Sequence, residues 1–345
     1  MKKLLAVMMG AALAWPVLAD DMMPALKKAA SKPDYAAVAS DFLPKAEQGD
    51  VLAQSVLAQL YLLGEGVAQD DAKAVHWATK AAAQGDMNAQ FLMGLLNFDG
   101  RGGLARNDAE ALSWFRKAAA QGDDEAAFKA ALMLVDGRGA EVDEQGAMDL
   151  LLPLAKKGDA NAQYAMAILL GREESTARDD AAAVGWLQRA ADNGHVKAYF
   201  NLGLMHELGR GVPQDDRKAI AFYRRAADAN DVDAQYVMGT FYAAGRGVAR
   251  DDAEAAEWFR RAAAQGDAEA QRYLAEMALQ GRAGALADND AARFYQRAAE
   301  QGDIEAQHYM GVLYGLGLGV PADERRSTEW FKRAQSTYLR RETAG

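Results

Sequence analysis

The four histidines are the side chains best suited to hold a metal or to transfer a proton, and they are far apart in the sequence. They are His76, His195, His206 and His308. None has a second histidine at metal-ligand spacing, and His206-Glu207 would need a histidine at position 210, where arginine stands, to form a zinc motif. The chain contains no cysteine and neither a Gly-x-Ser-x-Gly nor a Ser-x-x-Lys motif. We therefore expect no catalytic residue, no metal, no cofactor and no enzymatic activity.

Two further patterns could bind ions, and both have a simpler explanation. Residues 100–103 (Gly-Arg-Gly-Gly) have the composition of a phosphate loop, but such a loop follows a strand in a βαβ unit and this one follows a predicted helix. Paired acids that recur along the chain could hold calcium. They include Asp70-Asp71, Asp179-Asp180, Asp215-Asp216 and Asp251-Asp252. Because each pair opens a predicted helix, helix capping and interaction with the helix dipole explain them.

The first nineteen residues predict an export signal. Two lysines precede an apolar stretch that ends in Val17-Leu18-Ala19, which is the order of a secretory signal peptide. The stretch is shorter than the roughly 20 residues that span a bilayer, and no later segment is long and apolar enough. We expect a mature chain from Asp20 in the periplasm, or alternatively secreted, without membrane insertion.

The charge of the chain argues against binding nucleic acid. Without Lys2 and Lys3, 37 basic side chains face 49 acidic ones, a net charge of −12. An acidic surface repels phosphate backbones and anionic lipids. A basic cluster near the C-terminus runs against this balance, and a solvated face of a terminal helix is its simplest explanation. The cluster comprises Arg325, Arg326, Lys332, Arg333, Arg340 and Arg341.

An internal repeat sets the organisation of the chain. Gly-Asp or a close variant opens a unit at positions 49, 85, 122, 158, 194, 230, 266 and 302, at intervals of 36 or 37 residues. Such a period indicates stacked helical units that cannot bury their apolar faces alone. The predicted divisions are a signal peptide at 1–19, an N-terminal capping half-repeat at 20–48, eight repeats at 49–337 and a C-terminal tail at 338–345.

Each unit predicts a pair of helices. An aspartate such as Asp50 or Asp86 caps the first helix, and a Gly-x-Gly sequence ends it. A glycine recurs in mid-helix, as at Gly203, where it costs about 1 kcal/mol relative to alanine and so predicts the close approach of another helix. A column of Trp, Phe and Leu marks the predicted core side of the second helix. It runs Trp77, Trp114, Leu150, Trp186, Phe222, Trp258, Phe294 and Trp330.

The repeated pattern resembles the Sel-one-like repeats, relatives of the tetratricopeptide repeats. Its elements are Gly-Asp-x-x-Ala-Gln-x-x-Leu/Met-Gly, then Gly-Arg-Gly-Val, then Ala-x-x-Trp-Phe-x-Arg-Ala-Ala. The resemblance implies an all-α protein, a right-handed α/α superhelical solenoid of about eight 36-residue helix pairs with an N-terminal half-repeat. It also implies an adaptor or regulator that binds another protein through a concave surface. The fourth unit, at Arg172, and the seventh, at Ala283 and Ala287, depart from the pattern, so we expect irregular loops there.

The far side of the first helices is the predicted concave surface. One row along the repeats is aromatic, a second is aliphatic, and polar residues flank both. The predicted binding face consists of Phe91, Leu95, Phe128, Lys129, Leu132, Asn161, Tyr164, Ile168, Lys197, Phe200, Asn201, Leu204 and Tyr236. Apolar patches rimmed by charge commonly mark interaction sites. The alternative is that the aromatic rings pack against the neighbouring repeat.

Two other functions are compatible with parts of this pattern. Aromatic rows can stack on sugar rings, so a binder of cell-wall or extracellular polysaccharide is the second hypothesis. The third hypothesis, a β-lactam-related hydrolase, comes from the resemblance alone, because some exported relatives are linked to β-lactam binding or hydrolysis. Those relatives are rich in cysteine. This chain has neither the cysteines nor the serine motifs of that chemistry.

Overall fold

The computed structural model describes residues 35–172, 178–284 and 286–343, and every regular element in these ranges is an α-helix. The chain forms two compact units, which divide after Val142. The predicted signal peptide at 1–19 lies outside the described residues, as do residues 20–34 of the predicted half-repeat. Unit 1 contains α2 (Tyr35–Glu47), α3 (Val51–Leu63), α4 (Asp71–Ala83), α5 (Met87–Asp99), α6 (Asp108–Ala120) and α7 (Asp124–Val135). Unit 2 contains α8 (Glu144–Lys157), α9 (Ala160–Gly171), α10 (Asp180–Asp192), α11 (Val196–Leu208), α12 (Asp216–Asp228), α13 (Val232–Ala244), α14 (Asp252–Ala264), α15 (Ala268–Leu279), α16 (Asp288–Glu300), α17 (Ile304–Leu316) and α18 (Glu324–Thr343).

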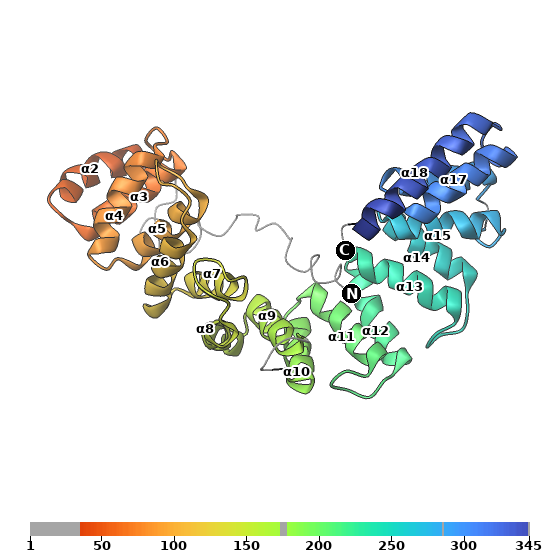
Figure 1. Ribbon diagram of the computed structural model, residues 1–345. Helices are drawn as coiled ribbons and strands as arrows, with labels where there is room; N and C mark the ends of the chain where they lie inside the picture. The colour runs from red at the N-terminus through yellow and green to blue at the C-terminus, as the bar shows by residue number, and fades with distance from the viewer. Residues whose placement is uncertain (1–34, 173–177, 285, 344–345) are drawn as a thin grey trace. The chain divides into compact units, whose positions relative to one another are not determined.

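Within each unit the helices follow one another as stacked hairpins, which confirms the predicted helical-pair solenoid (Figure 1). The odd-numbered helices are the first helices of the repeats, and the even-numbered ones from α4 onward are the second helices. Within a unit, a first helix packs against the second helix of its own repeat and against that of the preceding repeat, as α13 does with α14 and α12. Apolar burial is therefore shared between neighbouring repeats only.

The predicted caps are present at both ends of the helices. The Asp50 and Asp303 carboxylates each accept a bond from the backbone amide three residues on, at 2.7 Å in both cases. The first helix α13 ends at Gly245, whose φ of 70° is the left-handed conformation that glycine adopts without a Cβ clash. Two N-caps lack a side-chain cap bond, His195 of α11 and Ala287 of α16.

The mid-helix glycines make room for an aromatic ring of the second helix. A Cβ on Gly203 would lie 2.6 Å from the ring of Tyr223, and one on Gly239 would lie 2.6 Å from the ring of Phe259. Both rings are almost fully buried. The close approach that the glycines predict is thus made by a side chain rather than by a second backbone.

The fully buried column of the second helices lies one residue beyond the predicted Trp column. Phe115, Leu187, Tyr223 and Tyr295 are at most 1% exposed. Trp114 and Trp186 are half-buried, and a basic side chain three residues on lies over each ring, as Lys117 does over Trp114 at 3.8 Å. Trp114 and Trp186 therefore cover the edge of the core, whereas Trp77 and Trp258 are buried in it as predicted, at 6% and 3% exposed.

An arginine–aspartate pair joins each of several repeats to the next. Arg210, between the two glycines of its loop, donates to Asp180, at the start of the preceding second helix, with Nη2 2.8 Å from Oδ1. The following glycine, Gly211, lies so close that a Cβ would be 2.2 Å from the Asp180 carbonyl oxygen. The same pairing recurs at a spacing of 30 residues. It is made by Arg101 with Asp71, Arg138 with Asp108, Arg246 with Asp216 and Arg282 with Asp252.

The two repeats with irregular sequences keep this link. Arg172 pairs with Glu144 at 3.3 Å, and Arg282 pairs with Asp252 at 2.7 Å although alanine replaces the second glycine of its loop. At Ala287, which has no capping side chain, the backbone amide donates to the Asp290 carboxylate at 3.2 Å. Residues 173–177, where an irregular loop is predicted, lie outside the described residues, and both repeats keep the arginine contact with the preceding repeat.

Buried glutamines form a second link between repeats. Gln235 donates from Nε2 to the Ala227 carbonyl at the end of the preceding second helix, and its Oε1 accepts from Gln265 at 2.8 Å. Gln54, Gln90, Gln163 and Gln271 make the equivalent acceptor bond. Because an unpaired buried amide is costly, the Ala-Gln element of the repeat serves stability.

Candidate partner-binding face

In unit 1 the predicted binding face is only partly accessible. Phe91 is 4% exposed, and its ring packs against Phe115 of its own repeat with the centroids 5.7 Å apart. Leu95, Phe128 and Leu132 are half-buried. The Nζ of Lys129 lies 3.6 Å from a Glu125 carboxylate oxygen. Within the predicted face, the accessible apolar surface of this unit is therefore carried by Leu95, Leu132 and Phe128.

In unit 2 the aromatic row contacts neighbouring rings. Phe200 packs against Tyr223 at 5.4 Å, and Tyr236 packs against Phe259 and against Tyr273 of the next repeat, both at 5.9 Å. The contact of Tyr236 with Tyr273 is the packing against the neighbouring repeat that the sequence left as an alternative to exposure, whereas the contacts with Tyr223 and Phe259 lie within one repeat. Phe200 and Tyr236 are half-buried, so part of each remains accessible.

Tyr164 belongs to a polar cluster that joins α9 to α11. Its ring stacks on His195 with the centroids 4.1 Å apart, and its hydroxyl oxygen accepts from Asn201 Nδ2 at 3.1 Å. Burial raises the pKa of Tyr164 to about 12, and burial lowers that of His195, aided by Lys197. The tyrosine therefore stays protonated and the histidine neutral at pH 7. Asn201 is 5% exposed, so it orients Tyr164 from within the repeat.

The remaining residues of the face in unit 2 are more accessible. Asn161 is exposed, and Ile168, Lys197 and Leu204 are half-buried. Burial raises the pKa of Asp233, one repeat beyond Lys197, and the positive charge of Lys197 opposes that rise. The structure thus brings Asn161, Ile168, Lys197 and Leu204 to the surface, and it turns Asn201 inward.

The histidines do not form a catalytic or metal centre. His206 is 8% exposed and stacks on Phe222 at 5.5 Å, while His308 is exposed beside Phe331. Among the described residues, no three His, Asp or Glu side chains are grouped closely enough to hold a metal ion.

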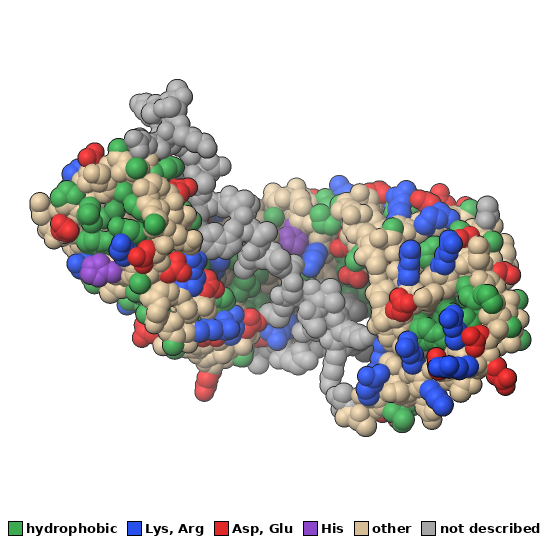
Figure 2. Space-filling view, turned by 90° about the horizontal axis from the view of Figure 1, so that it is seen from above, with side chains coloured by type: hydrophobic (Ala, Val, Ile, Leu, Met, Phe, Trp, Pro, Cys, Tyr) green, Lys and Arg blue, Asp and Glu red, His purple; other side chains and the backbone are tan. Residues whose placement is uncertain are grey.

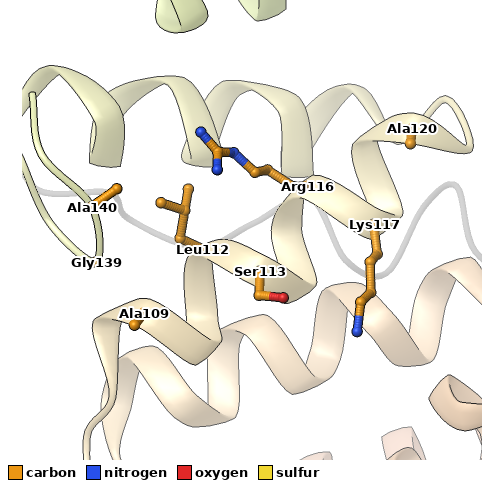
Figure 3. A pocket seen from close by; sticks show the side chains of 8 residues that line it. All are labelled: Ala109, Leu112, Ser113, Arg116, Lys117, Ala120, Gly139 and Ala140. Carbon is orange, nitrogen blue, oxygen red and sulfur yellow. The ribbon is translucent and has the colours of Figure 1, made fainter. Parts of the chain in front are cut away.

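A pocket of 410 Å³ in unit 1 lies between α6 and the loop after α7 (Figure 3). It is lined by Ala109, Leu112, Ser113, Arg116, Lys117, Ala120, Gly139 and Ala140. Arg116 and Lys117 point away from each other (Figure 3). No carboxylate or histidine lines the pocket.

The sequence interpretation missed the arginine–aspartate link. The first acid of each pair, such as Asp179, caps its helix as predicted, with Oδ1 accepting from Ala182 N at 2.9 Å. The second acid, Asp180, binds Arg178 and Arg210, and these bonds lower its pKa to about 2. The link could have been predicted from the sequence, because the second aspartate of each pair and the arginine of the next loop are always 30 residues apart.

Comparison with known proteins decides the family. The model of the Sel1 repeat matches eight times, at residues 51–86, 88–123, 124–159, 160–195, 196–231, 232–267, 268–303 and 304–334. The chain belongs to the Sel1 repeat family. Proteins built from Sel1 repeats are generally scaffolds for protein interactions, and their solenoid is typically non-catalytic.

Two solved structures share the architecture. A Sel1 repeat protein from Oxalobacter formigenes is 27% identical with a TM-score of 0.75, and the alignment covers 92% of this chain and 95% of that one. The Escherichia coli protein c5321, described as a protective antigen of uropathogenic strains with an SLR fold, is 30% identical with a TM-score of 0.76. That alignment covers 86% of this chain and 64% of c5321, so this Sel1 repeat chain spans less than two thirds of that relative. No match was found among curated proteins. No helix among the described residues is long and apolar enough to cross a membrane.

Proposed function

We propose that this Sel1 repeat protein is an exported, non-catalytic scaffold that holds another protein through the outward side of its first helices. The observation that carries the proposal is the half-exposed aliphatic row of the predicted binding face. Its members are Leu95, Leu132, Ile168 and Leu204. A core side chain would be fully buried and a solvated position would be polar, so partly exposed aliphatic side chains on the first helices of each unit are suited to anchor apolar segments of a partner.

Polar groups beside this row would orient the partner. In unit 2, Asn161 is exposed and offers both donors and an acceptor, while Lys197 offers a positive charge. Asn201 and Tyr164 bind each other, so they supply a rigid support rather than a direct contact. Export is proposed from the order of charged, apolar and small residues in 1–19.

The aromatic row gives less support to polysaccharide binding. Stacking on a sugar needs an open ring face, and Phe91, Phe200 and Tyr236 are each engaged by a neighbouring ring. A protein ligand does not need an open ring face, because its apolar side chains can pack against aliphatic side chains and ring edges. We therefore place a protein partner first.

The test is crosslinking and capture from the exported fraction of the native host with the wild-type chain and with Leu132→Asp/Leu204→Asp. Removing buried apolar anchors costs about 2 kcal/mol or more in binding, so a specific partner should be lost from the variant. The control is Leu63→Asp/Leu208→Asp, which places the same charges at residues 48% and 55% exposed at the ends of first helices. Circular dichroism establishes that both variants are folded.

A protein that the wild type and the control capture and the test variant does not would support the proposal. Equal capture by all three chains would refute the assignment to the aliphatic row. Retention on purified peptidoglycan or extracellular polysaccharide, with no protein captured, would replace it with carbohydrate binding.

A further inference from the structure

The last helix of the solenoid, α18, continues past the point at which every earlier second helix ends. The earlier second helices α4 to α16 have 13 or 14 residues and stop before a Gly-Asp turn or its variant, whereas α18 has 20 residues. Tyr338 stands where the turn glycine would be, and the helix runs to Thr343. Residues 338–343, predicted as part of a tail, therefore extend α18 and do not form the short turn seen after the earlier second helices.

The side of α18 that a following first helix would cover is open. Phe331 is 38% exposed, whereas its counterpart Tyr295 in α16 is fully buried against α17 and its surroundings. Thr328 and Gln335 are also exposed, and their counterparts Ala292 and Ala299 are buried. No described residue takes the place that α17 takes against α16.

This open side forms one wall of a groove of 790 Å³ between α15, α17 and α18. Its main side chains are Arg272, Glu276, His308, Tyr309, Phe331 and Tyr338. Tyr309 is 37% and Tyr338 52% exposed. Accessible rings of this size in a groove favour an apolar ligand, and the length of the groove along three helices suits a helix.

The earlier repeats indicate which end of a helix bound in this groove would lie beside His308. In three first helices the residue at the same position, Ser55, Tyr164 or Arg272, contacts the N-cap of the next first helix. Ser55 donates to the Asp86 carboxylate at 2.7 Å, and the Arg272 Nε lies 3.6 Å from the Asp303 carboxylate. An incoming helix in the same orientation would place its N-cap, preferably acidic, beside His308.

The α18 side of the groove carries more basic than acidic side chains, although Arg325 pairs with Glu329 at 3.0 Å. The opposite wall includes Glu276 and Glu305, and Glu305 pairs with Arg272 at 2.7 Å. Arg325 and Lys332 share a stripe with Thr328 and Gln335, at helical positions i, i+7, i+3 and i+10. α18 carries six basic and three acidic side chains in a chain of net charge −10. Figure 2, seen from the side on which α18 lies in Figure 1, shows Lys and Arg side chains gathered around hydrophobic ones over the C-terminal part of unit 2.

We propose that the open side of α18 is a docking site for a single amphipathic helix of another protein, with an acidic N-cap and an acidic flank. Two copies of this chain meeting through α18 would bring like charges together, which opposes association. The site shares no residue with the predicted binding face, so it is a second interaction surface.

The test uses a fluorescein-labelled synthetic peptide of residues 265–281 of this chain. It contains a first helix with the acidic N-cap Asp267 and the acidic side chains of Glu269 and Glu276. Fluorescence anisotropy should show saturable binding to the full chain. Binding should weaken by about tenfold or more with Arg325→Glu/Lys332→Glu, and likewise with a peptide carrying Asp267→Lys and Glu269→Lys.

The control is Lys156→Glu/Arg293→Glu, which reverses two exposed charges on the second helices α8 and α16 and should leave peptide binding unchanged. Phe331→Asp should abolish binding, with its fold checked by circular dichroism. Absence of saturable binding, or equal binding by the charge-reversed variant and the control, would overturn the proposal. So would a dimer in sedimentation that Phe331→Asp dissociates, since the occupant would then be a second copy. Leu132→Asp/Leu204→Asp should still bind the peptide, which separates this site from the proposed scaffold face.

Discussion

At the scale of single residues, the sequence predicted backbone features better than side-chain contacts. Aspartate N-caps and left-handed glycines follow from local chemistry, so Asp50 and Gly245 were placed correctly. The partner of the mid-helix glycine was not predicted, because it depends on a residue 20 positions later. The repeated spacing could have indicated this partner, since Gly203 faces Tyr223 and Gly239 faces Phe259, in each case 20 residues later.

We predict that Gly203→Ala destabilises the protein. The new Cβ would lie 2.6 Å from the buried Tyr223 ring, and overpacking costs about 1–3 kcal/mol, more than the gain of about 1 kcal/mol in helix propensity. The midpoint of urea unfolding followed by circular dichroism should fall. Gly185→Ala, in a helix with nothing within 4 Å of the added Cβ, should raise it.

A double-mutant cycle distinguishes the ring contact from a backbone effect. The fourth repeat pairs Ala167 with Leu187, so Gly203→Ala should cost little in a Tyr223→Leu background. An equal cost in both backgrounds would show that Tyr223 is not the cause.

At the scale of elements, the helix pairs were predictable and the links between them were not. Hydrophobic period and caps define each helix locally. The Asp180–Arg210 link joins residues 30 positions apart. It was not predicted from the sequence, because interaction with the helix dipole already accounted for an aspartate at this position. The predicted aliphatic row is half-buried, and the inward orientation of Asn201 depends on its bond to Tyr164.

We predict that Asp180→Asn lowers thermal stability at neutral pH and not at about pH 2. Bonds from Arg178 and Arg210 hold the pKa of Asp180 at about 2, below its ordinary 3.8. The carboxylate therefore stabilises the fold above about pH 3.8, and this contribution is lost as the pH falls toward 2. The difference in Tm between wild type and variant, measured from pH 7 to pH 2, should shrink over that interval.

The exposed residue Asp228, at the end of α12, provides the control. Asp228→Asn should leave Tm near that of the wild type at every pH. A loss of Tm for Asp180→Asn that persists unchanged at pH 2 would contradict a role for its charge and would indicate a packing effect.

At the scale of the whole molecule, the repeat period predicted the architecture because every repeat contacts only its neighbours. The identity of the partner does not follow from that regularity, since function depends on side chains that vary between repeats. The same one-dimensional order has a consequence for stability: a change at one junction should be felt at the adjacent repeats and not throughout the chain.

One junction lacks its arginine and allows this locality to be measured. Leu318, 40% exposed, stands between two glycines where the earlier links have arginine, and Gly319 approaches the Asp288 carbonyl as Gly211 approaches that of Asp180.

We predict that Leu318→Arg forms the missing pair with Asp288 and stabilises this junction by about 0.5–1 kcal/mol. Hydrogen exchange should slow in α15 to α18 by about two- to fivefold and stay unchanged in α3 to α6. Adding Asp288→Asn should remove the gain. Slower exchange throughout both units would show that the repeats unfold as one cooperative body, and unchanged exchange in α15 to α18 would show that the pair does not form.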